Sequence, residues 1–267
     1  MNVLQNFAIG QYVPGRSFVH LLDPRSKLLF VLAFAILVFL ANNWQTYTVL
    51  VVFTLSAVAV ARISPGYLVR SLKPVWFLIL LTIILHLLST KGGAVYFSWG
   101  WLTIEEQGVK QAVFISLRLT LLVLISSLLT LTTSPLDLTD GMERLLSPLK
   151  KIKVPVHEIS LMLSIALRFI PTLLEETDKI IKAQMARGAD LDSGNLLKRA
   201  KNLVPITVPL FISAFRRAEE LAWAMEARGY RGGSGRTRLR QLRFSWRDAV
   251  AALMILLILG LLGWWRA

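Results

Sequence analysis

The feature that most limits the fold of this chain is a series of long apolar runs without acidic residues. Short polar or basic stretches separate them, a pattern typical of helices inside a lipid bilayer. Hydrophobic residues make up 55% of the 267 residues, so we predict an all-α polytopic membrane protein with about five or more transmembrane helices. The runs are Leu28–Ala41, Tyr47–Ala61, Val75–Leu88, about 108–131 and Ala249–Trp265.

The charged residues lie mostly between these runs. The net charge is +14 and cysteine is absent, which excludes a disulfide framework, a thiolate metal site and a cysteine nucleophile. A soluble chain with this charge would suggest nucleic acid as a partner, but beside apolar runs basic residues set membrane topology, and we expect no nucleic acid. Arg16, Arg25 and Lys27 precede the first run, so the N-terminus is predicted to be cytoplasmic.

The composition changes after the fourth run. Residues 134–247 carry more basic than acidic side chains, which predicts a cytoplasmic or membrane-surface region. We therefore expect three parts: about four spans over 1–133, this coupling region over 134–247, and a last transmembrane helix over 248–267. Earlier in the chain, Pro65-Gly66 and Pro74 are expected to break the helical pattern between the second and third runs.

The middle part should contain two long helical segments that end near Arg187 and Arg228. Portions of them, 159–174 and 203–215, are apolar enough either to cross the membrane or to dock a membrane partner. The sequence leaves both possibilities open.

Both segments end in the same three residues. The arginine in each copy follows a mostly apolar helical stripe, and the glycine suits the position where a helix stops with positive φ. The small alanine would let another backbone approach closely. A single copy of the motif would indicate an ordinary helix end. Two copies in the same helical context predict two equivalent docking ends, which would fit two equivalent sites on partner proteins. The copies are Ala186-Arg187-Gly188 and Ala227-Arg228-Gly229.

Arg118 and His86 are two of the polar side chains that lie inside the apolar runs. Arg118 is an intramembrane candidate that either faces protein or a polar crevice, or extends toward a nearby interface. His86 fits a packed or interfacial histidine better than a ligand. The three histidines do not cluster along the chain, and we expect no metal site.

The common catalytic motifs are absent from the sequence. There is no Gly-x-x-x-x-Gly-Lys-[Ser/Thr], no His-Glu-x-x-His and no Gly-x-Ser-x-Gly, and we expect neither catalytic residues nor a cofactor. One alternative is a polytopic membrane enzyme that acts on lipid at the cytoplasmic face through Asp137, Asp140 and His157. These residues are more simply explained as caps and surface charges. A second is a membrane-surface anchor that uses the basic tail on anionic lipid.

Taken together, these residues resemble the transmembrane T component of energy-coupling factor (ECF) transporters, which are ABC-type importers of prokaryotes. The similarity covers nearly the whole chain and includes the paired Ala-Arg-Gly motifs. The tail from Arg228-Gly229-Tyr230-Arg231 to Gly235-Arg236-Thr237 resembles members that several substrate-binding subunits share. The N-terminal pattern that matches is Gly10-Gln11-Tyr12, Pro14-Gly15, Ser17, His20, Leu22-Asp23-Pro24-Arg25 and Lys27.

The resemblance implies partners and a role. It implies that Arg187 and Arg228 dock into two cytoplasmic ABC ATPase subunits, and that the long helices contact a small membrane subunit that binds the substrate. ATP hydrolysis would then take place on partner chains, and this chain would be a non-catalytic scaffold for the uptake of a vitamin or another micronutrient. The location implied is the prokaryotic cell membrane.

Overall fold

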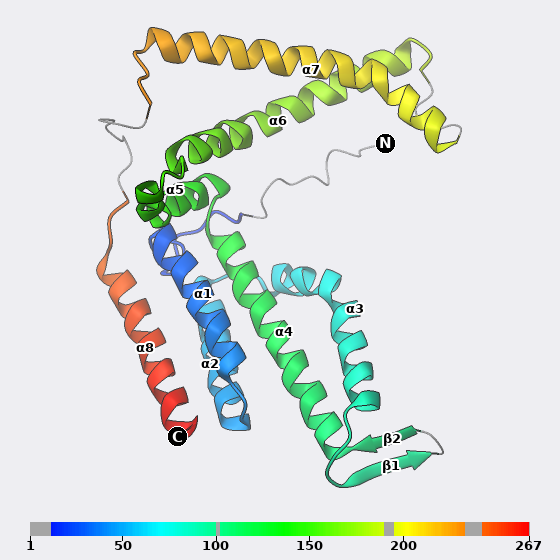
Figure 1. The fold of residues 1–267 in the computed structure, drawn as a ribbon, viewed down its shortest axis with the longest axis vertical. Coiled ribbons are helices and arrows are strands. Elements are labelled where there is room, and N and C mark those ends of the chain that lie inside the picture. The colour runs from blue at the N-terminus through cyan, green and yellow to red at the C-terminus, as the bar shows by residue number, and fades with distance from the viewer. Residues whose placement is uncertain (1–11, 100–101, 190–194, 233–241, 267) are drawn as a thin grey trace. The chain divides into compact units, whose positions relative to one another are not determined.

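The computed structural model describes residues 12–99, 102–189, 195–232 and 242–266, and this part of the chain is predominantly helical (Figure 1). The all-α prediction is confirmed, with one antiparallel strand pair among the described residues. The elements are α1 (Pro24–Leu40), α2 (Trp44–Ala61), α3 (Pro65–Ser89), β1 (Val95–Trp99), β2 (Leu102–Glu105), α4 (Glu106–Thr132), α5 (Pro135–Leu145), the 3-10 helix η1 (Ser147–Ile152), α6 (Val156–Ala186), α7 (Leu196–Ala227) and α8 (Trp246–Arg266).

Contacts within the chain divide it into two units. The bundle unit comprises the described residues up to 144 and from 242 onward, and it holds α1 to α5 and α8. The crossed-helix unit comprises the described residues between 145 and 232, and it holds η1, α6 and α7. The division into 1–133, 134–247 and 248–267 remains a prediction.

Short polar side chains form hydrogen bonds at the starts of four helices of the bundle unit, α1, α2, α5 and α8. Asp23 caps α1 because its Oδ1 accepts the Arg25 N–H at 2.9 Å, and Pro24 is the first helical residue, as predicted. Three other helices begin with a hydrogen bond between the residue before the helix and the residue three positions later. These pairs are Asn43–Thr46 for α2, Ser134–Asp137 for α5 and Ser245–Asp248 for α8.

An apolar core joins α1, α2 and α4. Its largest fully buried hydrophobic side chains are Tyr47, Phe34, Leu37, Leu50, Ile125, Leu131 and Val38. The Tyr47 ring stacks on Phe114 of α4, with centroids 4.9 Å apart. Other large apolar side chains point outward, and Trp76 and Phe77 of α3 are 65% and 71% exposed. So much exposed apolar surface would be unfavourable in water, and it fits a lipid environment.

The third helix differs from the prediction. Pro65 does open α3, but Pro74 lies inside it, so the prediction that Pro74 breaks the helix is wrong. A proline removes one backbone hydrogen bond and bends a helix, while the turns on either side can continue. Figure 1 shows α3 in two differently directed parts.

Five described helices are long and apolar enough to cross a membrane: α2, α3, α4, α6 and α8. The number of these helices agrees with the prediction, but the set differs, because it includes α6 and leaves out α1. With 17 residues, α1 is one residue shorter than α2, the shortest helix in this set. The apolar portion predicted at 159–174 lies in α6, which is among the five.

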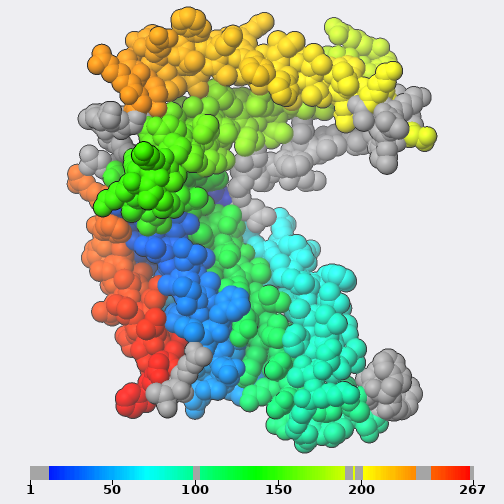
Figure 2. All heavy atoms as spheres, in the orientation of Figure 1, coloured from blue at the N-terminus to red at the C-terminus, as the bar shows by residue number. Residues whose placement is uncertain are grey.

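In the crossed-helix unit, α6 and α7 pack against each other (Figure 2). Glu176 of α6 bonds Ser213 of α7, and Gln184 further along α6 bonds the carbonyl of Pro205. Residue numbers thus rise on one helix while they fall on the other, so the helices run in opposite directions through the contact. Their C-terminal ends, which carry the Ala-Arg-Gly motifs, therefore point away from each other along the pair.

Candidate functional site

The first Ala-Arg-Gly motif forms the end of α6. Arg187 follows the last helical residue, and Gly188 adopts φ +86°. The Gly188 N–H donates to the Met185 carbonyl at 3.0 Å, and the Ala189 N–H donates to the Gln184 carbonyl at 3.0 Å. This pair of bonds is a Schellman motif, which satisfies carbonyls that the helix end would otherwise leave open.

The second motif forms the end of α7 in the same way. Gly229 adopts φ +71°, and its N–H donates to the Glu226 carbonyl at 2.8 Å. The Tyr230 N–H donates to the Met225 carbonyl at 3.0 Å. The predicted positive φ of both glycines is confirmed, and the repeat of three residues produces a repeat of backbone geometry.

Both helix ends are open to the surroundings. Arg187 and Arg228 are exposed, as are the alanine and glycine on either side of each. A Cβ added to Gly188 or Gly229 would meet nothing within 4 Å. Within the described part of the chain, neither guanidinium has an ion-pair partner. The two ends thus present a cation, open backbone and a small side chain to whatever binds there.

Comparison with known proteins identifies the kind of chain that carries these ends. The cobalt transport protein family, CbiQ, matches residues 15–239. The "Energy-coupling factor transporter transmembrane protein EcfT" of Brevibacillus brevis is 68% identical over 99% of this chain and 100% of its own length. This chain belongs to the EcfT family. The EcfT proteins of Bacillus subtilis and Acidaminococcus fermentans are each 53% identical to this chain over 99% of its length. These matches cover 100% and 98% of the two relatives' lengths, respectively.

Family membership confirms the resemblance stated from the sequence. The chain is a transmembrane component of an ECF transporter and a multi-pass membrane protein. Its relatives are named as transporter components, which suggests a non-catalytic subunit. The roles of single residues remain predictions.

In this EcfT-family chain, the N-terminal pattern has a structural role in the bundle unit. The His20 ring lies 2.7 Å from the Ser17 hydroxyl through Nδ1 and 3.0 Å from the Val13 carbonyl through Nε2. A Cβ on Gly15 would lie 2.8 Å from this ring, so the close approach requires glycine. Gly10 and Gln11 of the pattern, and Gly235 to Thr237 of the tail, lie outside the described residues.

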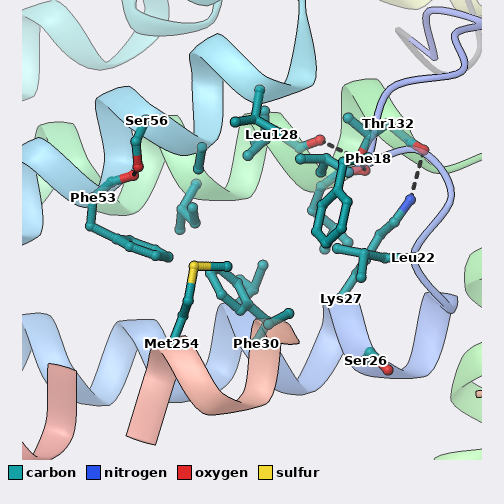
Figure 3. A pocket seen from close by; sticks show the side chains of 17 residues that line it. Phe18, Leu22, Ser26, Lys27, Phe30, Phe53, Ser56, Leu128, Thr132 and Met254 are labelled. Carbon is teal, nitrogen blue, oxygen red and sulfur yellow. Dashed lines mark hydrogen bonds between the residues drawn. The ribbon is translucent and has the colours of Figure 1, made fainter. Parts of the chain in front are cut away.

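Lys27 is the most completely buried cation of the pattern. Its side chain lies in the first turn of α1 and the residue is 5% exposed. The ammonium donates to the Thr132 carbonyl at 2.9 Å, the Thr133 hydroxyl at 3.0 Å and the His20 carbonyl at 3.2 Å. All three ammonium protons are therefore used to join α1, the end of α4 and the N-terminal segment. Figure 3 shows Lys27 beside Thr132 at the wall of an apolar cavity of about 120 Å³.

Asp23 and Asp248 extend this polar cluster to α8. The Asp23 N–H donates to Asp248 Oδ1 at 3.0 Å, and both aspartates are buried. The Arg25 Nη2 donates to Asp23 Oδ2 at 2.9 Å. Burial raises the pKa of Asp23, but the side-chain and backbone hydrogen bonds from Arg25 and its charge more than offset this, so the pKa lies below its ordinary value. The sequence analysis missed Asp248, although the Ser245-x-x-Asp248 spacing is that of a capping box.

Arg118 lies in the middle part of α4. It is half-buried, and its guanidinium carbon lies 5.2 Å from the centroid of the Phe39 ring of α1. Its Nε is buried and has no hydrogen-bond partner among the described residues. The guanidinium thus rests on an aromatic face rather than on a carboxylate.

Two residues of the enzyme alternative, Asp137 and Asp140, lie in α5, and the third, His157, lies in α6. Asp137 accepts the Ser134 hydroxyl at 2.8 Å, while the Asp137 N–H donates to that hydroxyl at 3.1 Å, so Asp137 is part of a helix cap. Asp140 is half-buried in α5 of the bundle unit, and His157 is buried in the first turn of α6. Within the described residues, no three His, Asp or Glu side chains are placed to hold a metal ion.

Proposed function

We propose that this chain couples ATP hydrolysis on two cytoplasmic ABC ATPase subunits to a small membrane subunit that binds the substrate. The single observation that carries the proposal is the pair of helix ends with the same sequence, the same Schellman geometry and the same exposed arginine. Two equal ends suit two equal partners, and a transporter driven by ATP needs a pair of ATPase subunits.

The proposed mechanism is mechanical. Closure of the ATPase pair on ATP would move the Arg187 and Arg228 ends, and the long helices α6 and α7 would carry that motion toward the substrate subunit. A helix is suited to this because its backbone hydrogen bonds resist extension along the axis. Exposed apolar side chains along α7, among them Phe211 and Phe215, provide a surface that fits a membrane subunit.

The proposal places the energy source and the substrate contacts on other chains. The sequence has no phosphate-binding Gly-x-x-x-x-Gly-Lys-[Ser/Thr], so ATP would be bound and hydrolysed by the partners. The cargo would be a vitamin or another micronutrient, and the location the prokaryotic cell membrane. The N-terminus and residues 134–247 would face the cytoplasm, because basic residues are concentrated there.

The test is reconstitution from defined components. The chain is purified with and without the ATPase and substrate-binding subunits encoded by its own organism, and ATP-dependent uptake is measured in proteoliposomes. The proposal expects a stable complex with two ATPase subunits, and uptake that requires this chain. Uptake by the other subunits alone, or catalytic turnover of lipid by this chain alone, would overturn it.

A further inference from the structure

Arg118 is a cation without a counter-charge in the apolar part of the bundle unit. Its side chain has neither a hydrogen bond nor an ion pair among the described residues. Helices α1, α2 and α3 contain no Asp or Glu, and Glu106, the one carboxylate of α4, lies about 18 Å from Arg118 along the helix. An unpaired charge in an apolar environment is costly. The described part of the bundle unit thus supplies no anion for this guanidinium.

A second cation, Lys110, lies on the same face of α4. Lys110, Phe114 and Arg118 follow one another at intervals of about one helical turn. The Lys110 Nζ lies 5.9 Å from the centroid of the Phe114 ring, and the Arg118 guanidinium carbon lies 5.2 Å from the centroid of the Phe39 ring. Lys110 is exposed, and it has no ion-pair partner in the described part of the chain. Both cations therefore rest on aromatic rings and keep their charge unbalanced.

The residues between α1 and α2 indicate where these cations lie relative to the membrane surface. The loop contains the polar residues Asn42 and Asn43, and the exposed Trp44 begins α2. Trp44 contacts Phe114 edge to face, with ring centroids 4.8 Å apart. Tryptophan beside polar residues is typical of the boundary between acyl chains and head groups. Arg118 lies about 6 Å farther along α4 than Phe114, so its long side chain can extend back to this boundary.

The chemistry of the two cations favours a phosphate as ligand. A guanidinium binds two oxygens of a phosphate through parallel N–H donors, and the donors of Arg118 have no acceptor among the described residues. Phe39 is 63% exposed, so the guanidinium on its ring lies near the lipid-facing surface. The phosphates available at that surface belong to phospholipids. Because Lys110 adds a second positive charge, a head group with net negative charge is favoured over a zwitterionic one.

An apolar stripe of α1 leads away from the cations. Leu32, Ile36 and Phe39 recur at helical spacing, and the first two are 61% and 60% exposed. The stripe begins at the ring beside the Arg118 guanidinium and runs toward the start of α1. An acyl chain attached to a phosphate at Arg118 can lie along it.

We propose that Lys110 and Arg118 bind the phosphate of an anionic phospholipid, with one acyl chain along the apolar stripe of α1. The lipid supplies the counter-charge and joins α1 to α4 at the end of α1 opposite to Lys27. In the proposed orientation this end lies in the outer leaflet. The site does not depend on the docking of ATPase subunits, so the two proposals can fail separately.

The test places one label beside the site. The chain has no cysteine, so Leu40→Cys, at the last residue of α1, can carry a single bimane fluorophore. The full chain is reconstituted in phosphatidylcholine nanodiscs that contain a small fraction of nitroxide-labelled phosphatidylglycerol or nitroxide-labelled phosphatidylcholine. We expect the phosphatidylglycerol to quench the bimane at an about fivefold lower fraction than the phosphatidylcholine.

Three variants make the test specific. Arg118→Leu should abolish the preference, so that both labelled lipids quench equally. Lys110→Gln changes an exposed side chain, should weaken the preference, and keeps the test valid if Arg118→Leu folds poorly. Arg70→Leu removes an exposed arginine of α3 and is the matched control, which should keep the wild-type preference. Equal quenching by both lipids in the wild type, or an unchanged preference in either site variant, would overturn the site.

Thermal unfolding in detergent separates lipid binding from folding. Added phosphatidylglycerol should raise the Tm of the wild type and of Arg70→Leu by more than that of Arg118→Leu, because a ligand that binds the folded chain stabilises it. Inorganic phosphate, which has no acyl chain for the stripe, should act equally on all three. An equal rise with phosphatidylglycerol in the wild type and Arg118→Leu would contradict the site. A rise with inorganic phosphate that only Arg118→Leu lacks would show a site for free phosphate instead, and would overturn the proposed lipid.

Discussion

Substitution of Lys27 tests whether the buried polar cluster holds the bundle unit together. Lys27→Met keeps the length of the side chain and removes the ammonium, which has three hydrogen bonds to the Thr132 carbonyl, the Thr133 hydroxyl and the His20 carbonyl. The first two of these bonds are buried. Leaving a buried acceptor without its partner costs about 1–3 kcal/mol, and burial of one fewer charge offsets part of that cost.

The expected loss of unfolding free energy for Lys27→Met is therefore ~2–4 kcal/mol. For a chain of this size, that corresponds to a fall in Tm of about 5–10 °C. The measurement is thermal unfolding of the purified chain in detergent. Lys151→Met, at an exposed position of η1, is the matched control and should unfold at the wild-type temperature. Equal Tm values for Lys27→Met and the control would refute the role given to the cluster.

Three other predictions concern the helix ends, Arg118 of α4 and the cap of α1. Gly188→Val and Gly229→Val should lower substrate uptake per ATP hydrolysed in proteoliposomes without loss of the complex, because positive φ strains a residue with a Cβ by ~1 kcal/mol or more. If both variants keep the wild-type uptake rate and the wild-type uptake per ATP, the ends are not tightly docked. Arg118→Leu should keep or raise the Tm of the isolated chain, because its Nε has no hydrogen-bond partner among the described residues, and a clearly lower Tm would contradict this. The lowered pKa of Asp23 means that its ionised form stabilises the fold above the unfolded pKa of about 3.9. The Tm difference between wild type and Asp23→Asn should therefore shrink as the pH falls below about 4, and a constant difference would argue against the cap.

The sequence was sufficient where local chemistry decides the structure. Asp23 followed by Pro24 predicts the start of α1, and each Arg-Gly predicts a helix end with positive φ, because these features depend on neighbouring residues alone. Pro74 was misjudged because the local preference of proline for helix ends was outweighed by the apolar residues on both sides, which keep α3 helical.

Contacts between distant segments could not be predicted in the same way. The bond from Asp23 to Asp248 spans 225 positions of sequence, and no local pattern pairs those two residues. Glu176 of α6 and Arg217 of α7 each look like an ordinary surface charge, and only the fold shows that the Arg217 Nη2 donates to Glu176 Oε2 at 2.8 Å.

The most direct test of the proposed coupling is to reverse the charge of both docking arginines. Arg187→Glu combined with Arg228→Glu leaves the backbone of both helix ends intact, and loss of one partner of a buried charge contact typically costs ~2–5 kcal/mol. Lys151→Glu combined with Lys201→Glu, at two exposed positions of the same unit, changes the net charge equally and serves as the control. The measurement is the amount of ATPase subunits that co-purify with the membrane-inserted chain. We predict that the arginine variant loses both ATPase subunits while the control retains them; normal co-purification with the arginine variant would contradict the docking role of the two helix ends.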